Sequence, residues 1–467
     1  MNRAHSLDAL RGFAIIAMIF SGTIGSGKLP AWMYHAQVGP RSGFSFDPNI
    51  YGITWVDIVF PFFLFAMGAA FPFSIGKKIE KEVSKLSLVL DSLLRGFKLA
   101  FFAIFIQHMY PWVLSYPENY SSWMISLLSF VLMFFMFTDF TIIRSRTVMK
   151  LLKVLAYIIG IIMLQTVDYI DNRTFSLYNS NIIIMVLANM AIFASIIYIF
   201  TYNKPKRRIL VLPFVMAVLL GSSTENSWIK NVYDFTPIPW LYSFSYLKYL
   251  FIVIPGSIVG EYLRNWIIER NSQSETPRNM VKYNYIYILL LSLLIIVNNI
   301  YGLYMRYLLF NLIFTIFLLI VLYYFLLNQD FNVSYWKKLY VFGAYLLVLG
   351  LFFEAYEGGI RKDYSTYSYY FVTSGLACFA MIVFSIVSDI YKVKWIELLE
   401  DAGHNPMIAY VAPQLVVTPI LGLIGIRDIV ELLNTTAYLG LVKGVLLTTL
   451  SLTVAIICTK KKIFWKT

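Results

Sequence analysis

Long apolar runs recur along almost the entire chain, and they constrain its fold more than any other feature. An α-helix needs about 20 apolar residues to cross the hydrocarbon core of a bilayer. Runs of about 14 to 24 apolar residues give fourteen candidate crossings in the 467 residues. They lie at 10–27, 54–75, 93–110, 122–140, 151–168, 180–202, 209–222, 245–263, 283–300, 307–328, 339–355, 368–390, 405–424 and 437–458.

Two of these runs are weaker than the others. The run 209–222 is short, and the run 405–424 contains Pro413 and Pro419, which interrupt helical hydrogen bonding. We therefore expect about 11 to 14 crossings. The polar stretches between the runs are short, and the longest are 28–53, 76–92, 223–244 and 264–282.

The composition agrees with a membrane protein. Only 13% of the residues are charged and 59% are hydrophobic, whereas soluble proteins carry about 25% charged residues. The sequence therefore predicts an all-α fold, a polytopic transmembrane helical bundle, with a single integral membrane domain over residues 1–467. We expect it to be a multi-pass protein of a bacterial inner membrane, with the lipid bilayer as its surroundings.

The net charge of +13 is explained by membrane orientation better than by a nucleic-acid partner. A nucleic-acid binder gathers its basic residues on one soluble face, whereas here they fall in short clusters between apolar runs. If the N-terminus is cytoplasmic, the inside segments carry 28 of the 38 Lys and Arg residues. The positive-inside rule then predicts that both termini are cytoplasmic.

His35 is the first candidate for catalysis. It lies just beyond the first apolar run, and the next run opens with Trp55-Val56-Asp57. An imidazole titrates near neutral pH and can act as a general base, while Asp57 could fix its tautomer. The alternative is an interfacial histidine that is hydrogen-bonded to a carbonyl group.

Other charged and polar residues form candidate binding groups. Asp8 and Arg11 lie one helical turn apart on the first run, where charges are costly and often face a polar path, although a structural ion pair is the simpler explanation. Lys362, Asp363 and Ser368 belong to a loop dense in charges and hydroxyl groups, which suits a sugar or an anion. An ordinary solvated loop with an aromatic belt has the same composition.

Asn405 opens a predicted helix on the cytoplasmic side, in the segment 403–406 (GHNP). Its side chain can cap that helix, and the free N–H groups of a helix N-terminus favour phosphate, which would suit coenzyme A. Plain capping needs no ligand. The two cysteines, Cys378 and Cys458, lie within apolar runs, so no disulfide and no metal site is expected.

Several segments together resemble the heparan-alpha-glucosaminide N-acetyltransferase family of multi-pass membrane acyltransferases. The likeness covers roughly residues 1–75 and 355–467, and it is most specific near the N-terminus. The matching segments are Arg3, 6–12 (SLDALRG), 34–36 (YHA), 55–68 (WVDIVFPFFLFAMG), 357–358 (EG), 362–363 (KD), 368–369 (SY), 403–406 (GHNP), 410–411 (YV) and 461–466 (KKIFWK).

The resemblance implies that acetyl-CoA is used as a substrate from the cytoplasmic side and that the acetyl group reaches an amino sugar or glycan acceptor on the outer side. The family's catalytic histidine corresponds to His35, which would act as general base or acetyl carrier, and a homodimer is possible. The chain departs from the family at Ser21-Gly22-Thr23, where many members have Asn, and at Ser365, where an aromatic residue is usual. These departures affect the acyl contact and the acceptor.

Two other functions fit the same composition. A carrier for a glycan or a small anion would also need a large helical bundle with charges at membrane depth, although we find no internal repeat of the kind common in transporters. An inactive scaffold that retains the fold is the third hypothesis. The sequence does not distinguish these functions without the resemblance.

Overall fold

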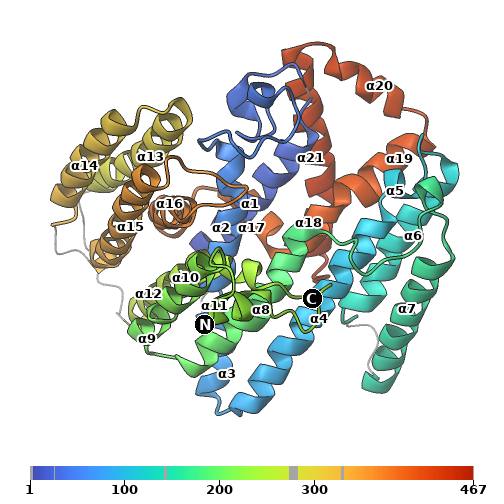
Figure 1. Ribbon diagram of the computed structural model, residues 1–467, viewed down its shortest axis with the longest axis horizontal. Coiled ribbons are helices and arrows are strands. Elements are labelled where there is room, and N and C mark those ends of the chain that lie inside the picture. The colour runs from blue at the N-terminus through green and yellow to red at the C-terminus, as the bar shows by residue number, and fades with distance from the viewer. Residues whose placement is uncertain (1–3, 26, 141–144, 273–281, 328–330, 466–467) are drawn as a thin grey trace.

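The computed structural model describes residues 4–25, 27–140, 145–272, 282–327 and 331–465, so Arg3 and Lys466 of the resemblance lie outside the described residues. The structure is 77% helical, and no strand occurs in the described ranges. Figure 1 shows helices packed against one another throughout. The predicted all-α polytopic bundle is therefore confirmed.

Twelve helical segments among the described residues are long and apolar enough to cross a membrane, which lies within the expected range. They are α1 (His5–Thr23), α2 (Trp55–Ala69, continuing helically to Glu80), α6 (Tyr120–Phe137), α7 (Arg146–Thr166), α8 (Ile182–Phe200), α12 (Leu250–Ser272), α13 (Lys282–Met305), α14 (Leu308–Phe325), α15 (Phe331–Tyr356), α16 (Tyr367–Phe384), the segment Pro406–Leu423 and α21 (Ala437–Lys460).

Two predicted crossings are not among the twelve. The run 93–110 belongs to α4 (Lys85–Met109), a long helix that contains Arg95 and Lys98 and is therefore less apolar. The run 209–222 forms α10 (Val211–Gly221), which has only 11 residues. At about 1.5 Å per residue, α10 alone is too short to span a bilayer core of about 30 Å.

The segment Pro406–Leu423 is among the twelve, as predicted, but its helix is interrupted. It consists of α18 (Pro406–Ala412), a π-helical turn (Pro413–Val417) and α19 (Thr418–Leu423). Pro413 cannot donate a backbone hydrogen bond, and this is a usual cause of a wider turn within a helix.

The remaining helices are short connections. They are α5 (Pro111–Leu114), α9 (Pro205–Ile209), α11 (Trp228–Asp234), α17 (Ile396–His404) and α20 (Arg427–Glu431), while α3 (Lys77–Glu80) ends the helical continuation of α2.

Helices α1 and α2 lie at the centre of the molecule (Figure 1). α1 packs against α2, α16, α17, α18 and α21, so both ends of the sequence contribute to one core. Its contact with α17 is close because both helices carry glycine: a Cβ on Gly12 would lie 1.7 Å from the Leu399 carbonyl oxygen, and one on Gly403 would lie 2.3 Å from that of Asp8.

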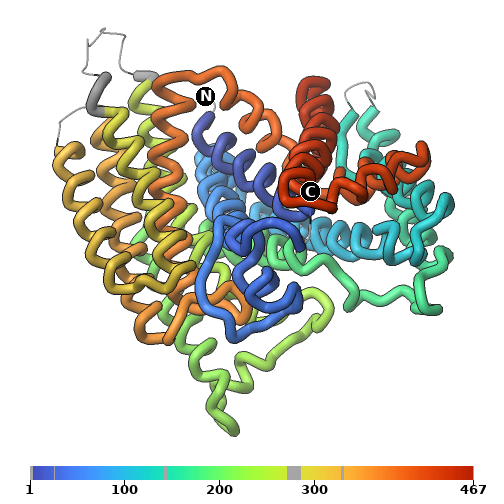
Figure 2. The backbone as a smooth tube through the Cα atoms, turned by 90° about the horizontal axis from the view of Figure 1, so that it is seen from above, coloured from blue at the N-terminus to red at the C-terminus, as the bar shows by residue number. Residues whose placement is uncertain are grey.

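The two ends of α1 lead to different polar regions. His5 and Asp8 begin the helix, and the 28–53 loop follows its other end. Figure 2 shows this loop, in blue, on the side of the molecule away from the beginning of α1. With 19 residues and a rise of about 1.5 Å per residue, α1 separates the two regions by about 28 Å.

Glycine also sets the contact between α2 and α12. A Cβ on Gly256 would lie 2.1 Å from the Phe65 carbonyl oxygen, and a Cβ on Gly260 would lie 2.3 Å from that of Ala69. Two small residues four apart let the backbones of neighbouring helices approach closely, which is a common way to join membrane helices.

We predict that Gly256→Ala and Gly260→Ala each lower the stability of the folded protein. The added methyl group meets backbone rather than a flexible side chain, and such overpacking costs about 1–3 kcal/mol. Thermal unfolding of the purified protein measures the loss as a lower Tm. Gly22→Ala is the matched control, because its Cβ would meet nothing within 4 Å. Equal Tm values for all three variants would contradict this account of the α2–α12 contact.

Candidate active site

Asp57 is fixed at the start of α2 by a capping box. Thr54 precedes the helix, and its hydroxyl oxygen accepts a hydrogen bond from the Val56 amide. The Asp57 carboxylate in return accepts from the Thr54 amide at 2.9 Å. This reciprocal pairing satisfies N–H groups that a helix start leaves without partners, and it holds the carboxylate beside the loop that carries His35.

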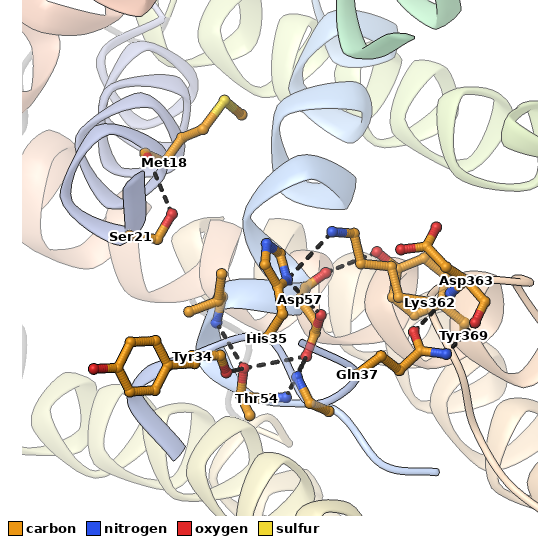
Figure 3. A network of polar contacts seen from close by, with 12 residues as sticks. Met18, Ser21, Tyr34, His35, Gln37, Thr54, Asp57, Lys362, Asp363 and Tyr369 are labelled. Atoms are coloured by element: carbon orange, nitrogen blue, oxygen red, sulfur yellow. Dashed lines mark hydrogen bonds and ion pairs between the residues drawn. The ribbon is translucent and has the colours of Figure 1, made fainter. Parts of the chain in front are cut away.

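The predicted contact between His35 and Asp57 is present. Nδ1 of His35 lies 2.8 Å from Oδ1 of Asp57, and the next amide in the loop, that of Ala36, donates to Oδ2 at 3.2 Å. The Asp57 side chain is almost completely buried, whereas that of His35 is 36% exposed. A buried carboxylate therefore holds a ring that remains partly exposed, and Figure 3 shows the two side chains in contact.

Lys362 completes this group from a distant part of the sequence. Its Nζ lies 3.2 Å from Nδ1 of His35 (Figure 3). The lysine sits in the loop between α15 and α16, so its ammonium group brings a positive charge near the buried carboxylate of Asp57. Compensation of this kind is what a buried charge requires.

Hydrogen bonds between the two loops position Lys362. The Gln37 side chain accepts from the Asp363 amide at 2.9 Å and donates to the Asp363 carbonyl oxygen. The Gly52 amide donates to the Ile360 carbonyl oxygen at 2.8 Å. Because Gln37 is 2% exposed, these bonds are shielded from water and fasten the 357–366 segment to the 28–53 loop.

Residues at and before the start of α16 also stabilise the group of His35, Asp57 and Lys362. The hydroxyl of Tyr369 donates to the backbone carbonyl oxygen of Asp57 at 2.7 Å. Glu357 accepts hydrogen bonds from the amides of Tyr367 and Ser368, so it caps the helix. Ser368 is fully buried and its hydroxyl donates to Thr366. Its polar atoms are therefore engaged within the protein, and its predicted binding role stays a prediction.

The arrangement suits a general base. A neutral imidazole carries one proton, and the carboxylate 2.8 Å from Nδ1 favours the tautomer in which Nδ1 holds it. Lys362 can only donate, so in this tautomer it lies near Nδ1 as a positive charge and not as a hydrogen-bond donor. Nε2 then presents a lone pair, and within the described residues Nε2 of His35 has no hydrogen-bond partner. The site can therefore accept a proton from a neighbouring hydroxyl or amine.

A second polar cluster lies at the beginning of α1. Nε2 of His404 lies 3.1 Å from Oδ2 of Asp8, and Arg11 lies 3.6 Å from Oδ1 of the same carboxylate. The Arg11 side chain also reaches the Gly403 carbonyl oxygen at 3.5 Å. Asp8 and Arg11 thus form the predicted ion pair, and His404 joins it from α17.

The predicted capping role of Asn405 is wrong. Its side chain makes no capping hydrogen bond to α18. Instead its amide nitrogen donates to the Thr459 hydroxyl and to the Ile463 carbonyl oxygen, each at 2.9 Å. Asn405 is 2% exposed, so in this structure it joins the end of α17 to the C-terminal segment. Its contact with coenzyme A stays a prediction.

A cavity of about 490 Å³ lies near the beginning of α1. It is lined by the side chains of His5, Arg270 and Lys392, together with acidic groups that include Asp389 and Glu400. His35 does not line this cavity, which lies toward the opposite end of α1. The two polar regions are therefore separate in this structure.

The N-terminal half of the chain matches a known protein family. Residues 3–263, more than half of the 467, match the family model described as a domain of unknown function, DUF5009. The chain belongs to the DUF5009 family. The DUF5009 match includes His35 and Asp57 but ends before Lys362 and Asn405. No curated protein matches the chain.

Sequence analysis did not identify several residues of the site. Thr54 has a local signal, because Thr54-x-x-Asp57 has the spacing of a capping box. Gln37 has no local signal and Tyr369 has only its place in the matching segment 368–369, since their partners lie 326 and 312 residues away. His404 likewise contacts Asp8 across 396 positions.

We predict that Asp57→Asn destabilises the protein. The amide that replaces the carboxylate has only one acceptor oxygen for the bonds from His35, Ala36 and Thr54. Losing hydrogen bonds to a buried charged group costs about 2–3 kcal/mol, which thermal unfolding detects as a lower Tm. Asp171→Asn is the matched control, because the Asp171 side chain is 67% exposed. An unchanged Tm for Asp57→Asn would show that the carboxylate does not organise this region.

Proposed function

We propose that this protein is a transmembrane acyltransferase. It takes the acetyl group of acetyl-CoA at the cytoplasmic side and transfers it to an amino sugar or glycan acceptor at the other side. The single observation that carries the proposal is the partly exposed His35 ring, 2.8 Å from the buried carboxylate of Asp57. The resemblance to the heparan-alpha-glucosaminide N-acetyltransferase family supports the same chemistry.

His35 acts as the general base in this proposal. As the acceptor amine attacks the thioester carbonyl, the amine proton moves to Nε2 of His35, and Asp57 stabilises the imidazolium through Nδ1. A C–N bond forms and the C–S bond breaks. The imidazolium then gives this proton to the departing thiolate of coenzyme A. His35 is therefore neutral again at the end of the reaction. An acetyl-imidazole on His35 is the covalent variant of this mechanism.

Lys362 and Asp363 bind the reactants. The Lys362 ammonium group, 3.2 Å from His35, would stabilise the negative charge that develops on the thioester carbonyl oxygen. The Asp363 carboxylate has no hydrogen bond within the described residues, because its loop is fastened through backbone atoms. It is available to the acceptor's ammonium group before deprotonation.

The coenzyme would enter at the beginning of α1. Arg270 and Lys392 line the cavity of about 490 Å³ there, and such side chains bind phosphate groups. Asp8 and Arg11, which pair with each other beside His404, would hold the mouth of the path.

A carrier for a glycan or a small anion is the second candidate. The interruption of the segment Pro406–Leu423 by a π-helical turn favours it, because discontinuous helices build the binding sites of many transporters. Counterflow of labelled sugar in proteoliposomes without an acetyl donor would support the carrier and count against the enzyme.

We predict that His35→Ala lowers acetyl transfer from labelled acetyl-CoA to glucosamine by about 100-fold or more, because general-base catalysis contributes about 10²–10⁴-fold. The measurement is product formation by the purified full-length protein. Lys28→Ala, at an exposed position of the same loop, is the control and should retain activity. Undiminished turnover in folded His35→Ala protein would refute the catalytic assignment.

We also predict the membrane orientation. Ser45 and Lys81 are both exposed and lie in polar segments that precede and follow α2. With cytoplasmic termini, a membrane-impermeant maleimide should label Ser45→Cys in intact cells but label Lys81→Cys only after permeabilisation. The native Cys378 and Cys458 are buried and should give little background. The reverse labelling pattern would place His35 on the cytoplasmic side and exclude transfer in the proposed direction.

A further inference from the structure

A second polar cavity lies at the other end of α1, on the side toward α21. Its volume is about 370 Å³, within the range of about 300–1,000 Å³ typical of small-molecule sites. Gly22 and Thr23 of α1 line it, together with residues from the α4–α6 connection, from the broken segment Pro406–Leu423 and from α20 and α21. His35 does not line this cavity.

The charged residues of this cavity neutralise one another. Arg427 donates two hydrogen bonds to Glu118, each at 2.7 Å. Lys443 donates to Glu431 at 2.7 Å and is itself buried. Each basic side chain of the cavity is therefore paired with an acidic one. No unpaired charge of these four residues remains to bind a charged ligand.

The remaining polar groups can both donate and accept hydrogen bonds. Gln414 and Thr418 line the cavity, and their side chains make no hydrogen bond within the described residues. Asn434 donates to Glu431 at 2.9 Å, but its carbonyl oxygen is buried beside Gly25 and is not exposed to the cavity. Gln414 lies in the π-helical turn, a feature frequently found at functional sites.

One aromatic ring supplies an apolar surface. Trp112, a residue that is 37% exposed, also lines the cavity, and its ring is stacked on Tyr110 at 4.6 Å between ring centroids. A rigid ring held in this way offers a flat face at low entropic cost. Sugars pair such a face with their C–H groups and direct their hydroxyl groups to amides and carboxylates.

We propose that this cavity is a binding site for a neutral saccharide. The cavity lies close in the chain to the candidate active site: Thr23 lines it, and two residues later the Gly25 carbonyl oxygen accepts a hydrogen bond at 2.6 Å from Tyr34, the neighbour of His35. A glycan that enters from this side of the molecule would meet the cavity beside the His35 loop. Saccharide binding here does not depend on acyl transfer, because no group of the His35 site takes part.

The test is calorimetry on the full-length protein in lipid nanodiscs, with no acyl donor present. Glycoside detergents must be absent throughout the purification, because their sugar headgroups would compete. The probes are N-acetylglucosamine, which is neutral, glucosamine, which is cationic, and glucuronate, which is anionic. We expect saturable binding of N-acetylglucosamine and at least about fivefold weaker binding of both charged sugars, corresponding to the loss of about one hydrogen bond.

Two substitutions locate the binding site without breaking its ion pairs. Gln414→Ala and Thr418→Val should each raise the Kd for N-acetylglucosamine about fivefold. The matched control is Thr449→Val on the exposed face of α21, where the hydroxyl bonds only to the Val445 carbonyl oxygen at 2.8 Å. Thermal unfolding identifies any variant that fails to fold. If one variant fails, the Kd of the other variant tests the proposal.

Three results would overturn the proposal. They are an absence of saturable binding of N-acetylglucosamine, equal or tighter binding of a charged sugar, and an unchanged Kd in folded Gln414→Ala and Thr418→Val proteins. None of these results bears on the role of His35, which is tested separately by acetyl transfer.

Discussion

The buried carboxylate of Asp57 is the interaction on which the candidate site depends. It caps α2 through Thr54, accepts the Ala36 amide and holds the His35 ring. A carboxylate that is 2% exposed is unfavourable without compensating partners. The hydrogen bonds and the nearby Lys362 provide them. The Asp57 carboxylate therefore both caps the central helix α2 and orients the His35 ring.

Close backbone contacts bring the distant parts of this site together. Glycines let α1 approach α17 and let α2 approach α12 more closely than any side chain would allow. α1 and α2 also both pack against α16, and the loop that precedes α16 carries Lys362. The position of Lys362 beside His35 thus follows from helix packing in the core as well as from the bonds between the two loops.

The molecule separates its polar chemistry into distinct regions. The pair of Asp8 and His404 lies at the beginning of α1, and the His35 group lies beyond its other end. In a bilayer, charged groups usually face partners or water-filled space. The charged side chains of both regions have partners of opposite charge. The saccharide cavity adds a third region, in which paired charges leave neutral hydrogen-bonding groups for a ligand.

The sequence by itself determined the helical membrane class, most crossings and the pairing of His35 with Asp57, because apolar runs and charges near helix ends are local signals. It misjudged Asn405, whose partners Thr459 and Ile463 lie more than 50 positions away. Only the tertiary structure decided that Lys362, a predicted binding residue, lies beside His35 and that Gln37 and Tyr369 join the site. Their contacts cross more than 300 positions, and local periodicity carries no information about which distant loops dock together.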